Sequence, residues 1–331
     1  MLFGAFPYRL RGRAVPLLLL VLSASLAACG ATSPSATPVG SSAAIPSIEP
    51  PFPRTLIDDA GGSITISAAP QRIVALTPAS VETLATLNFA NRVVGIAECT
   101  CTPDAFAAIP VVAGYEGVDL ERLVALEPDL VFVGGSGFTP ADAIAAMRAA
   151  NITVVTIDPK GVEGVYRTMR LIGDAVGGSA PAAQLVASVR ADMARLAALI
   201  PAGARPKVFY EIDATSTIYG LAPDDYAAEL IGLAGGEPVT SGSPGVYEIA
   251  LETLVAAAPE VILLGDAAYG TTAEGVAARP GWSAIPAVVG GAIRPVDGDL
   301  VTTPGPRLAS ALAALIVAID PGISVPAIPS P

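Results

Sequence analysis

The stretch Tyr115-Glu-Gly-Val-Asp-Leu-Glu-Arg-Leu-Val-Ala-Leu-Glu-Pro-Asp-Leu-Val-Phe-Val133 has the pattern of a loop, a short helix and a buried strand. Asp119 stands where an N-cap is expected, because its carboxylate can accept a hydrogen bond from a free amide of the first helical turn. Pro128 follows the helix, and the apolar run from Leu130 to Val133 is typical of a buried strand. A helix that leads into such a strand predicts an α/β fold.

The chain contains this helix and strand twice. A shift of 131 residues places Leu120-Glu-Arg-Leu-Val-Ala-Leu-Glu-Pro-Asp-Leu-Val131 over Leu251-Glu-Thr-Leu-Val-Ala-Ala-Ala-Pro-Glu-Val-Ile262. A Tyr-Glu pair precedes each copy, at Tyr115-Glu116 and, one residue out of register, at Tyr247-Glu248. The period is too long for a solenoid unit, so the repeat predicts two related lobes.

Residues 1–28 have the features of a signal peptide. Three arginines precede an apolar run from Ala14 to Leu26, which is too short for a membrane span. The sequence Leu26-Ala-Ala-Cys29 resembles the lipobox of bacterial lipoproteins. This resemblance implies that Cys29 is acylated and tethers the mature protein to a membrane on its extracytoplasmic side. The alternative is an ordinary secretory signal with an incidental cysteine.

Residues 29–54 are predicted to form a flexible linker. They are mostly Ser, Thr, Ala and Pro, with Glu49 as the single acid, and they show no periodicity that could build a core. A spacer that holds the globular part off the bilayer and plain disorder without a function both fit this composition.

The charge balance points away from nucleic acid. The net charge of the chain is −12, and removal of residues 1–28 takes away three arginines and no acid, which leaves −15. An acidic domain has no electrostatic footprint for nucleic acid, whereas it suits docking against a basic partner surface.

Strands and helices alternate through residues 55–160, which we expect to form the N-terminal lobe. The expected strands are Ile64–Ile66, Arg72–Leu76, Val93–Ile96, Leu130–Val133 and Ile152–Ile157. Helices are expected to follow Thr77 and Asp119 and to span Ala141–Ala150. This alternation predicts a parallel sheet with helices on its faces.

Residues 161–203 are predicted to form the connecting helix, with a break at Gly177-Gly178, and residues 204–320 the C-terminal lobe. Residues 321–331 are expected to be a loose tail. The predicted fold class is therefore α/β, with two Rossmann-like lobes whose central sheets are mostly parallel, joined by one long backbone helix.

Three segments in order, Arg72–Glu82, Val93–Ile96 and Leu120–Val131, resemble the substrate-binding proteins of ABC importers for cobalamin and ferric siderophores. The resemblance runs from about Pro70 to about Ile319, and its third segment is the most specific. It implies that a single backbone helix joins the lobes and limits hinge motion. It also implies that a cobalt- or iron-containing chelate is captured between the lobes and delivered to an ABC permease.

The resemblance assigns a role to Glu121 and Glu252, which occupy matching positions in the two copies. In this family one surface glutamate per lobe engages arginines of the permease. The alternative is that any acid in a first helical turn is favoured by the helix dipole, by about 0.3–1 kcal/mol.

The resemblance also places Tyr115 and Tyr247 on opposite walls of the cleft, at about the positions where cobalamin-binding relatives have tryptophans. Tyrosines keep flat walls with polar tips, although they weaken the assignment to cobalamin. The alternative is that both are half-buried packing residues. Four further candidates for ligand contact lie at strand ends or in loops of the second lobe: Asp213, Tyr219, Thr302 and Arg307. Arg307 could equally pair with a neighbouring acid, and Glu82 is expected to be structural.

Cys99 and Cys101 form a Cys-Thr-Cys sequence after a strand of the first lobe. Outside the cytoplasm the default is a disulfide, although a bridge between residues i and i+2 closes a small, strained ring. Two free thiols and a soft-metal chelate are the alternatives.

The chain contains no histidine. This excludes Ser-His-Asp and Cys-His catalysis and disfavours a binding site for free zinc or manganese, so we expect no enzyme and no protein-bound metal. A cobalamin-like corrinoid and a ferric siderophore remain as ligand classes, and a catecholate siderophore would need more convergent arginines than Arg307. The alternative from another class is a sensor or adhesion lipoprotein on the same scaffold.

Overall fold

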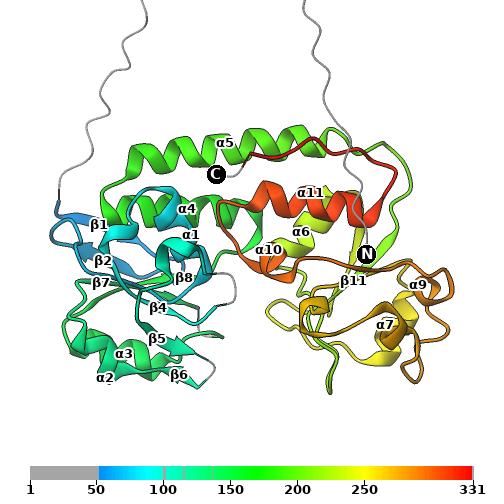
Figure 1. Ribbon diagram of the computed structural model, residues 1–331, viewed down its shortest axis with the longest axis horizontal. Coiled ribbons are helices and arrows are strands. Elements are labelled where there is room, and N and C mark those ends of the chain that lie inside the picture. Colours follow the sequence, from blue (N-terminus) through cyan, green and yellow to red (C-terminus); the bar gives the residue numbers. More distant parts are fainter. Residues whose placement is uncertain (1–51, 100–101, 115, 136, 330–331) are drawn as a thin grey trace, which may run out of the picture. The chain divides into compact units, whose positions relative to one another are not determined.

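The computed structural model describes residues 52–99, 102–114, 116–135 and 137–329 (Figure 1). These residues all belong to one compact unit. The predicted signal peptide and nearly all of the predicted linker lie outside the described residues. Within the described residues, no helix is long and apolar enough to span a bilayer.

The first lobe is built on a six-stranded sheet with the order β6-β5-β4-β3-β7-β8, in which only the β5–β6 pair is antiparallel. Its strands are β3 (Ile73–Ala75), β4 (Val93–Ala97), β5 (Val111–Gly114), β6 (Gly117–Val118), β7 (Leu130–Gly134) and β8 (Thr153–Ile157). Its helices are α1 (Pro78–Thr86), η1 (Ala90–Arg92), η2 (Asp104–Phe106), α2 (Leu120–Ala125) and α3 (Ala141–Ala149). An antiparallel pair, β1 (Arg54–Ile57) and β2 (Ser63–Ile66), precedes this sheet.

The second lobe has a four-stranded, fully parallel sheet with the order β10-β9-β11-β12. Its strands are β9 (Lys207–Glu211), β10 (Glu237–Val239), β11 (Val261–Leu264) and β12 (Ile293–Pro295). Its helices are α6 (Tyr226–Leu233), α7 (Leu251–Ala257), η3 (Ala267–Tyr269), α8 (Ala273–Ala277), α9 (Pro286–Val289), α10 (Gly298–Thr302) and α11 (Leu308–Ile319). The two predicted sheets and their mainly parallel order are confirmed.

The sequence repeat corresponds to a structural repeat, in which α2 and β7 of the first lobe match α7 and β11 of the second. Leu123 and Leu254, which are 131 residues apart, are both fully buried on the inner side of their helices. The Asp119 carboxylate accepts a hydrogen bond of 2.9 Å from the amide of Arg122, as expected of an N-cap. The second copy has Ala250 at this position and no side-chain cap.

Alternate residues of each buried strand face opposite sides of the sheet, and each side is covered. Ile73 and Phe132 belong to the core cluster that includes residues of α1 and α4 (Gly161–Val176), whereas Val74 and Val131 pack with Leu123 of α2 and with α3. A sheet covered on both faces needs apolar residues at consecutive positions, which explains the uninterrupted apolar runs in the sequence.

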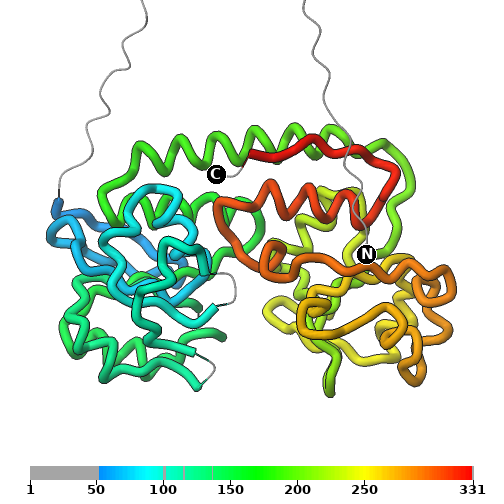
Figure 2. The backbone as a smooth tube through the Cα atoms, in the orientation of Figure 1, coloured from blue at the N-terminus to red at the C-terminus, as the bar shows by residue number. Residues whose placement is uncertain are grey.

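The connection between the lobes consists of two helices packed side by side, whereas the sequence predicts one long helix with a break. It consists of α4 and α5 (Ser179–Ala197), which form an antiparallel hairpin around Gly177-Gly178, the predicted break (Figure 2). A side chain on Gly173 of α4 would collide with Ala182 of α5, and Arg190 stacks on Tyr166, with 4.1 Å from its guanidinium carbon to the ring centre. The 19 residues of α5 form the long helix of the connection, whereas α4 folds back along it.

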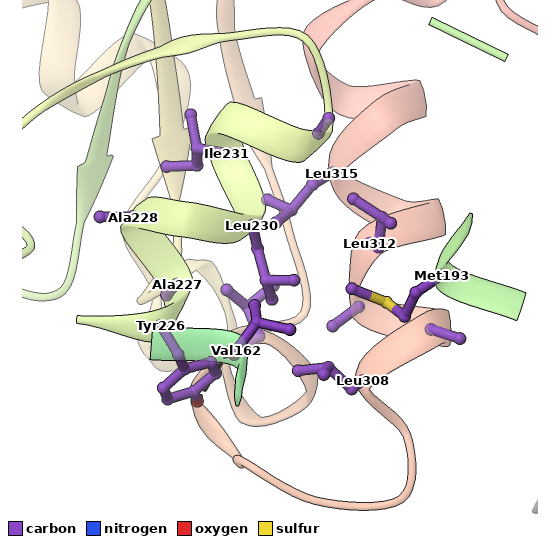
Figure 3. Close-up of a cluster of buried hydrophobic side chains, with 14 of the residues drawn as sticks. Val162, Met193, Tyr226, Ala227, Ala228, Leu230, Ile231, Leu308, Leu312 and Leu315 are labelled. Atoms are coloured by element: carbon purple, nitrogen blue, oxygen red, sulfur yellow. Dashed lines mark hydrogen bonds between the residues drawn. The ribbon is translucent and has the colours of Figure 1, made fainter. Parts of the chain in front are cut away.

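Helix α4 contributes to the cores of both lobes. Its first half, from Val162 to Met169, packs with α5, α6, α11 and β9 of the second lobe (Figure 3). Its second half, from Leu171 to Val176, packs against α1 and the sheet of the first lobe. The lobes are therefore joined by shared apolar packing as well as by covalent connection.

Both ends of the globular part make more contacts with its core than the sequence predicts. Arg54, placed at the end of the linker, begins β1, is buried, and donates a hydrogen bond of 2.7 Å to the carbonyl of Asp174. The carboxyl-terminal segment also differs from the loose tail that the sequence predicts. Its side chains Ile323, Val325 and Ile328 pack against the core of the second lobe. The tail is therefore packed at three partly buried positions, while the residues between them are exposed.

Candidate functional site

The helices that follow the carboxyl ends of the two sheets contact one another near their amino ends. Glu82 of α1, which follows β3, accepts hydrogen bonds from Arg307, which follows β12, with 2.9 Å from its Nε to Oε1. The amide of Val162, just after β8, donates a hydrogen bond of 2.7 Å to Oε2 of Glu229 in α6, which follows β9. Because all strands of a parallel sheet end at one edge, these two contacts make the carboxyl edges of the lobes face each other.

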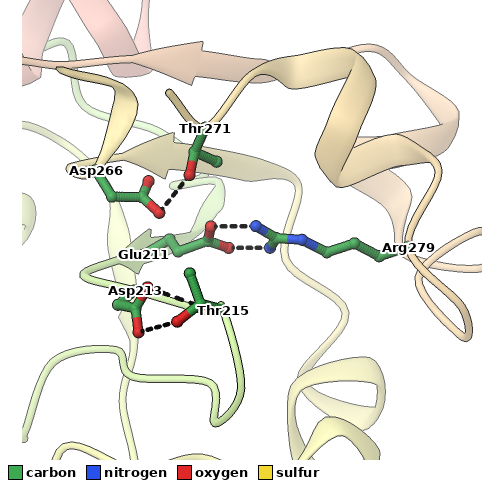
Figure 4. Close-up of polar contacts among 6 residues, drawn as sticks. All are labelled: Glu211, Asp213, Thr215, Asp266, Thr271 and Arg279. Carbon is green, nitrogen blue, oxygen red and sulfur yellow. Dashed lines mark hydrogen bonds and ion pairs between the residues drawn. The ribbon is translucent and has the colours of Figure 1, made fainter. Parts of the chain in front are cut away.

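The second lobe brings three of the candidate ligand residues together beside β9. The amide of Tyr219 donates to the carbonyl of Asp213 over 2.8 Å, and the amide of Gly220 donates to the carbonyl of Tyr247 over 2.8 Å. The Asp213 carboxylate is bonded to the amide and hydroxyl of Thr215 (Figure 4). Tyr219 keeps 38% of its surface exposed, which leaves its ring open to a partner.

Tyr247 is half-buried, and its hydroxyl donates a hydrogen bond of 3.0 Å to Oδ2 of Asp225, the N-cap of α6. Burial and the charge of Asp225 raise the pKa of Tyr247, so the hydroxyl stays protonated at neutral pH. This geometry agrees with the alternative of a packing residue. Tyr115, its expected counterpart, lies outside the described residues.

The last two candidates in the second lobe are already bonded within the chain. The hydroxyl of Thr302 donates to the carbonyl of Gly298 over 2.8 Å, which closes a turn of α10. Arg307 pairs with Glu82, the neighbouring acid that the sequence left as the alternative, although this partner is 225 residues away. The Arg307 guanidinium therefore forms an ion pair between the lobes instead of being unpaired and available to an anionic ligand.

Glu82 is buried and only partly satisfied. Both bonds from Arg307 reach Oε1, while Oε2 has no hydrogen-bond partner among the described residues. Burial therefore outweighs the attraction of Arg307 and raises the pKa of Glu82 above its ordinary value of 4.5. Burial likewise raises the pKa values of Glu211 and Asp225.

These raised pKa values predict that mild acid stabilises the fold. Between the ordinary and the raised value the folded chain binds more protons than the unfolded chain, so the free energy of unfolding falls as pH rises through that window. The free energy of unfolding should therefore increase as the pH is lowered from 7 toward 4.5. Urea midpoints at pH 7, 6 and 5 measure this increase, and Glu82→Gln should reduce it.

Glu163→Gln is the matched control for this prediction. Glu163 is exposed, and its hydrogen bond to Arg190 lowers its pKa, so its contribution is lost as pH falls. Its substitution should leave the increase intact or make it steeper. Identical pH profiles for the unsubstituted chain and Glu82→Gln would contradict the assignment.

One buried ion pair was not found by sequence reasoning. Glu211, at the end of β9, is fully buried and accepts two bonds from Arg279, of 2.6 and 2.8 Å (Figure 4). The Arg279 guanidinium also lies over the ring of Trp282, 4.7 Å from its centre. The sequence shows Arg279 only as part of the turn Arg279-Pro-Gly-Trp282, and nothing local identifies a partner 68 residues away.

A second feature that sequence reasoning missed is a pair of exposed aromatic side chains. Phe138 follows β7 and is 83% exposed, and Tyr269 follows β11 and is 72% exposed. The signal was available, since extension of the 131-residue shift by seven positions beyond Val131 and Ile262 aligns Phe138 with Tyr269.

Glu121 and Glu252 are both exposed in the first turns of the matching helices α2 and α7. The structure thus keeps the equivalence on which their predicted role depends. Cys99 is disulfide-bonded. Its predicted partner Cys101 lies outside the described residues, as does Cys29, so the pairing stays a prediction.

Two surface hollows, of about 970 and about 480 Å³, adjoin the two contacts between the lobes, since Glu229 lines the larger and Pro306, next to Arg307, lines the smaller. The larger lies beside α6 and the end of α5, and the smaller lies between α1, α5, α11 and the tail. Neither hollow is lined by a predicted ligand residue, so neither coincides with the ligand site predicted from the sequence. Across the described part of the chain, no group of three or more Cys, Asp or Glu side chains is placed to hold a metal ion.

The comparisons with known proteins agree with this architecture. The family model described as periplasmic binding protein matches residues 73–299. The ABC transporter substrate-binding lipoprotein YvrC of Bacillus subtilis (strain 168) is 32% identical over 275 residues, which cover 82% of this chain and 86% of that protein. The cobalamin-binding protein of Halobacterium salinarum (strain ATCC 29341 / DSM 671 / R1) is 28% identical over 276 residues, 79% of this chain and 73% of that one.

A solved structure extends the comparison to the fold. The periplasmic heme-binding protein BhuT in complex with two hemes is 30% identical, with a TM-score of 0.67, and covers 76% of this chain and 99% of its own. The relatives named lipoprotein and periplasmic indicate an extracytoplasmic location. The chain belongs to the periplasmic binding protein family and is the substrate-binding component of an ABC transporter rather than an enzyme.

Proposed function

We propose that this protein captures a large metal chelate between its two lobes and delivers it to an ABC permease. The observation that carries the proposal is that the carboxyl edges of two repeated sheets face each other, since ligands of open α/β sheets bind at such edges. The ligand classes are a cobalamin-like corrinoid and a ferric siderophore. The relatives that bind cobalamin and heme support a macrocycle over a siderophore.

The proposal includes a lipid anchor at Cys29. It is supported by the Leu26-Ala-Ala-Cys29 sequence and by the lipoprotein relative. Residues 30–53 would then be the spacer between the membrane and the globular part, which begins at β1.

The proposal also assigns the contact with the permease to Glu121 and Glu252. Support comes from their exposure and from their equivalent places in the two lobes. Two like charges, one on each lobe, would fix both position and rotation against a basic surface.

Titration of the full-length protein in lipid nanodiscs tests the capture of a chelate. Cobalamin, heme, a ferric hydroxamate and a ferric catecholate are added in turn, and the heat of binding and the visible absorbance of each ligand are recorded. We expect saturable binding of one macrocycle with a dissociation constant below about a micromolar. Calorimetry is preferred to tryptophan fluorescence because the single tryptophan, Trp282, is buried.

Binding of a ferric siderophore alone would preserve capture but replace the macrocycle as ligand class. Saturable binding of none of the four would contradict the proposed function.

A further inference from the structure

Phe138 and Tyr269 occupy the same structural position in the two lobes. Each lies in the loop directly after the repeated strand, β7 or β11. The amide of Phe138 donates a hydrogen bond of 2.8 Å to the carbonyl of Gly135, and the amide of Tyr269 donates one of 2.9 Å to the carbonyl of Asp266. Gly135 and Asp266 are themselves 131 residues apart, so the two loops share one backbone turn.

A buried hydroxyl or carboxylate holds each loop in place. In the first lobe the hydroxyl of Thr139, which is buried, accepts a bond of 3.1 Å from the amide of Gly134. In the second lobe the hydroxyl of Thr271 donates a bond of 2.7 Å to Oδ2 of the buried Asp266 (Figure 4). Each aromatic ring thus projects from a turn that is bonded to the body of its lobe, which limits the entropy lost on binding.

The sheet order places these loops at the centre of the facing edges. Strand β7 lies between β3 and β8, and β11 lies between β12 and β9. The segment after β3 contacts the segment after β12 through Glu82 and Arg307, and the segment after β8 contacts α6, after β9, through Val162 and Glu229. The loops after β7 and β11 are the middle members of both series, so they face each other.

Both rings remain exposed although each lobe has a large apolar core. A single exposed apolar side chain needs no explanation, but exposure of two aromatic rings at equivalent positions on facing edges is typical of a binding site. A ring face favours a flat apolar surface, since stacking adds to the area that is buried.

We propose that Phe138 and Tyr269 are the two aromatic contacts of the ligand site, one in each lobe, and that they pack on opposite flat faces of a planar macrocyclic metal chelate. This inference rests on the proposed capture of a chelate between the lobes. It assigns to Phe138 and Tyr269 the role that sequence analysis predicts for Tyr115 and Tyr247, of which Tyr247 has its hydroxyl bonded to Asp225.

Alanine substitutions in the full-length protein in nanodiscs test the assignment, with cobalamin and heme as probes. Phe138→Ala and Tyr269→Ala should each raise the dissociation constant of the bound macrocycle by roughly 10- to 100-fold, as is typical of central aromatic contacts. Tyr269→Phe should bind within about threefold of the unsubstituted protein, because it keeps the ring face. The visible absorption band of the bound macrocycle should shift in the alanine variants and not in Tyr269→Phe.

Val289→Ala is the matched control. Val289 is 74% exposed, as much as Tyr269, but it lies at the end of α9, near the amino end of β11, where Ala287 bonds to Pro259. Its substitution should leave binding unchanged.

The outcomes separate this inference from the proposed function. Tight macrocycle binding by the unsubstituted protein and by both alanine variants would overturn the aromatic pair and leave capture intact. Binding of a ferric siderophore alone would overturn the planar ligand class. Absence of any binding by the unsubstituted protein would overturn the proposed capture and the aromatic pair with it.

Discussion

The double substitution Glu121→Ala, Glu252→Ala is expected to reduce uptake by roughly a hundredfold or more, because each lobe loses a charge that fits a basic docking surface. Ligand affinity should be unchanged, since both side chains are exposed and neither belongs to the facing loops. The fold should lose little, as an acid in a first helical turn contributes only about 0.3–1 kcal/mol. Uptake is measured in cells whose own copy of the protein is replaced by the variant, and affinity by calorimetry.

The chain offers a matched control for this experiment. Asp142 in α3 and Glu274 in α8 are also exposed acids in first helical turns, one in each lobe. The double variant Asp142→Ala, Glu274→Ala removes the same net charge and should transport normally. Equal uptake by the two double variants, whether high or low, would refute a specific role for Glu121 and Glu252.

Arg279→Ala is expected to lower the free energy of unfolding by about 3–5 kcal/mol, because it leaves the Glu211 carboxylate buried without its partner. Domains of this kind have about 5–15 kcal/mol in total, so the loss should be evident as a large shift of the urea midpoint. Burial already raises the pKa of Glu211, with Arg279 opposing it. Its removal should raise that pKa further. Circular dichroism is the suitable probe, since Arg279 stacks on Trp282 and would disturb its fluorescence.

Arg190→Ala is the control that separates the effect of burying the partner carboxylate from the effect of losing an arginine. Arg190 also pairs with a glutamate, Glu163, and also stacks on an aromatic ring, that of Tyr166. Its partner is 62% exposed, however, whereas Glu211 is fully buried. The cost should stay within about 1 kcal/mol, as for other surface pairs. Equal losses in both variants would show that burial of Glu211 does not decide the effect.

The structural features that sequence reasoning predicts are those that depend on residues adjacent in the chain. The Asp119 cap, the break at Gly177-Gly178 and the strand from Leu130 each depend on a few adjacent positions, and all three are present. The two-lobe architecture followed from the repeat, because a shift of 131 residues aligns two helix–strand units. Local capping and apolar periodicity are sufficient for this part of the fold.

The features that sequence reasoning misses, or predicts without naming the partner, depend on residues far apart in the chain. Glu82 and Arg307 are 225 residues apart, and Glu211 and Arg279 are 68 apart, so no spacing rule connects them. For the candidate site, the position of Tyr115 and Tyr247 before the repeated helices is the only local signal that points to them. Exposure after folding distinguishes Phe138 and Tyr269, and exposure is not visible in a sequence without its tertiary packing.

The division of α4 between two cores means that the duplicated halves cannot be separated as modules. A fragment that ended after α4 would keep Leu171 to Val176 packed in the first lobe but would expose Val162 to Met169 to water. Those side chains include Tyr166 and Met169, which are buried in the intact chain. Such a fragment would present a contiguous apolar surface and aggregate. The two halves share a repeated sequence, but neither has a complete interior without the other.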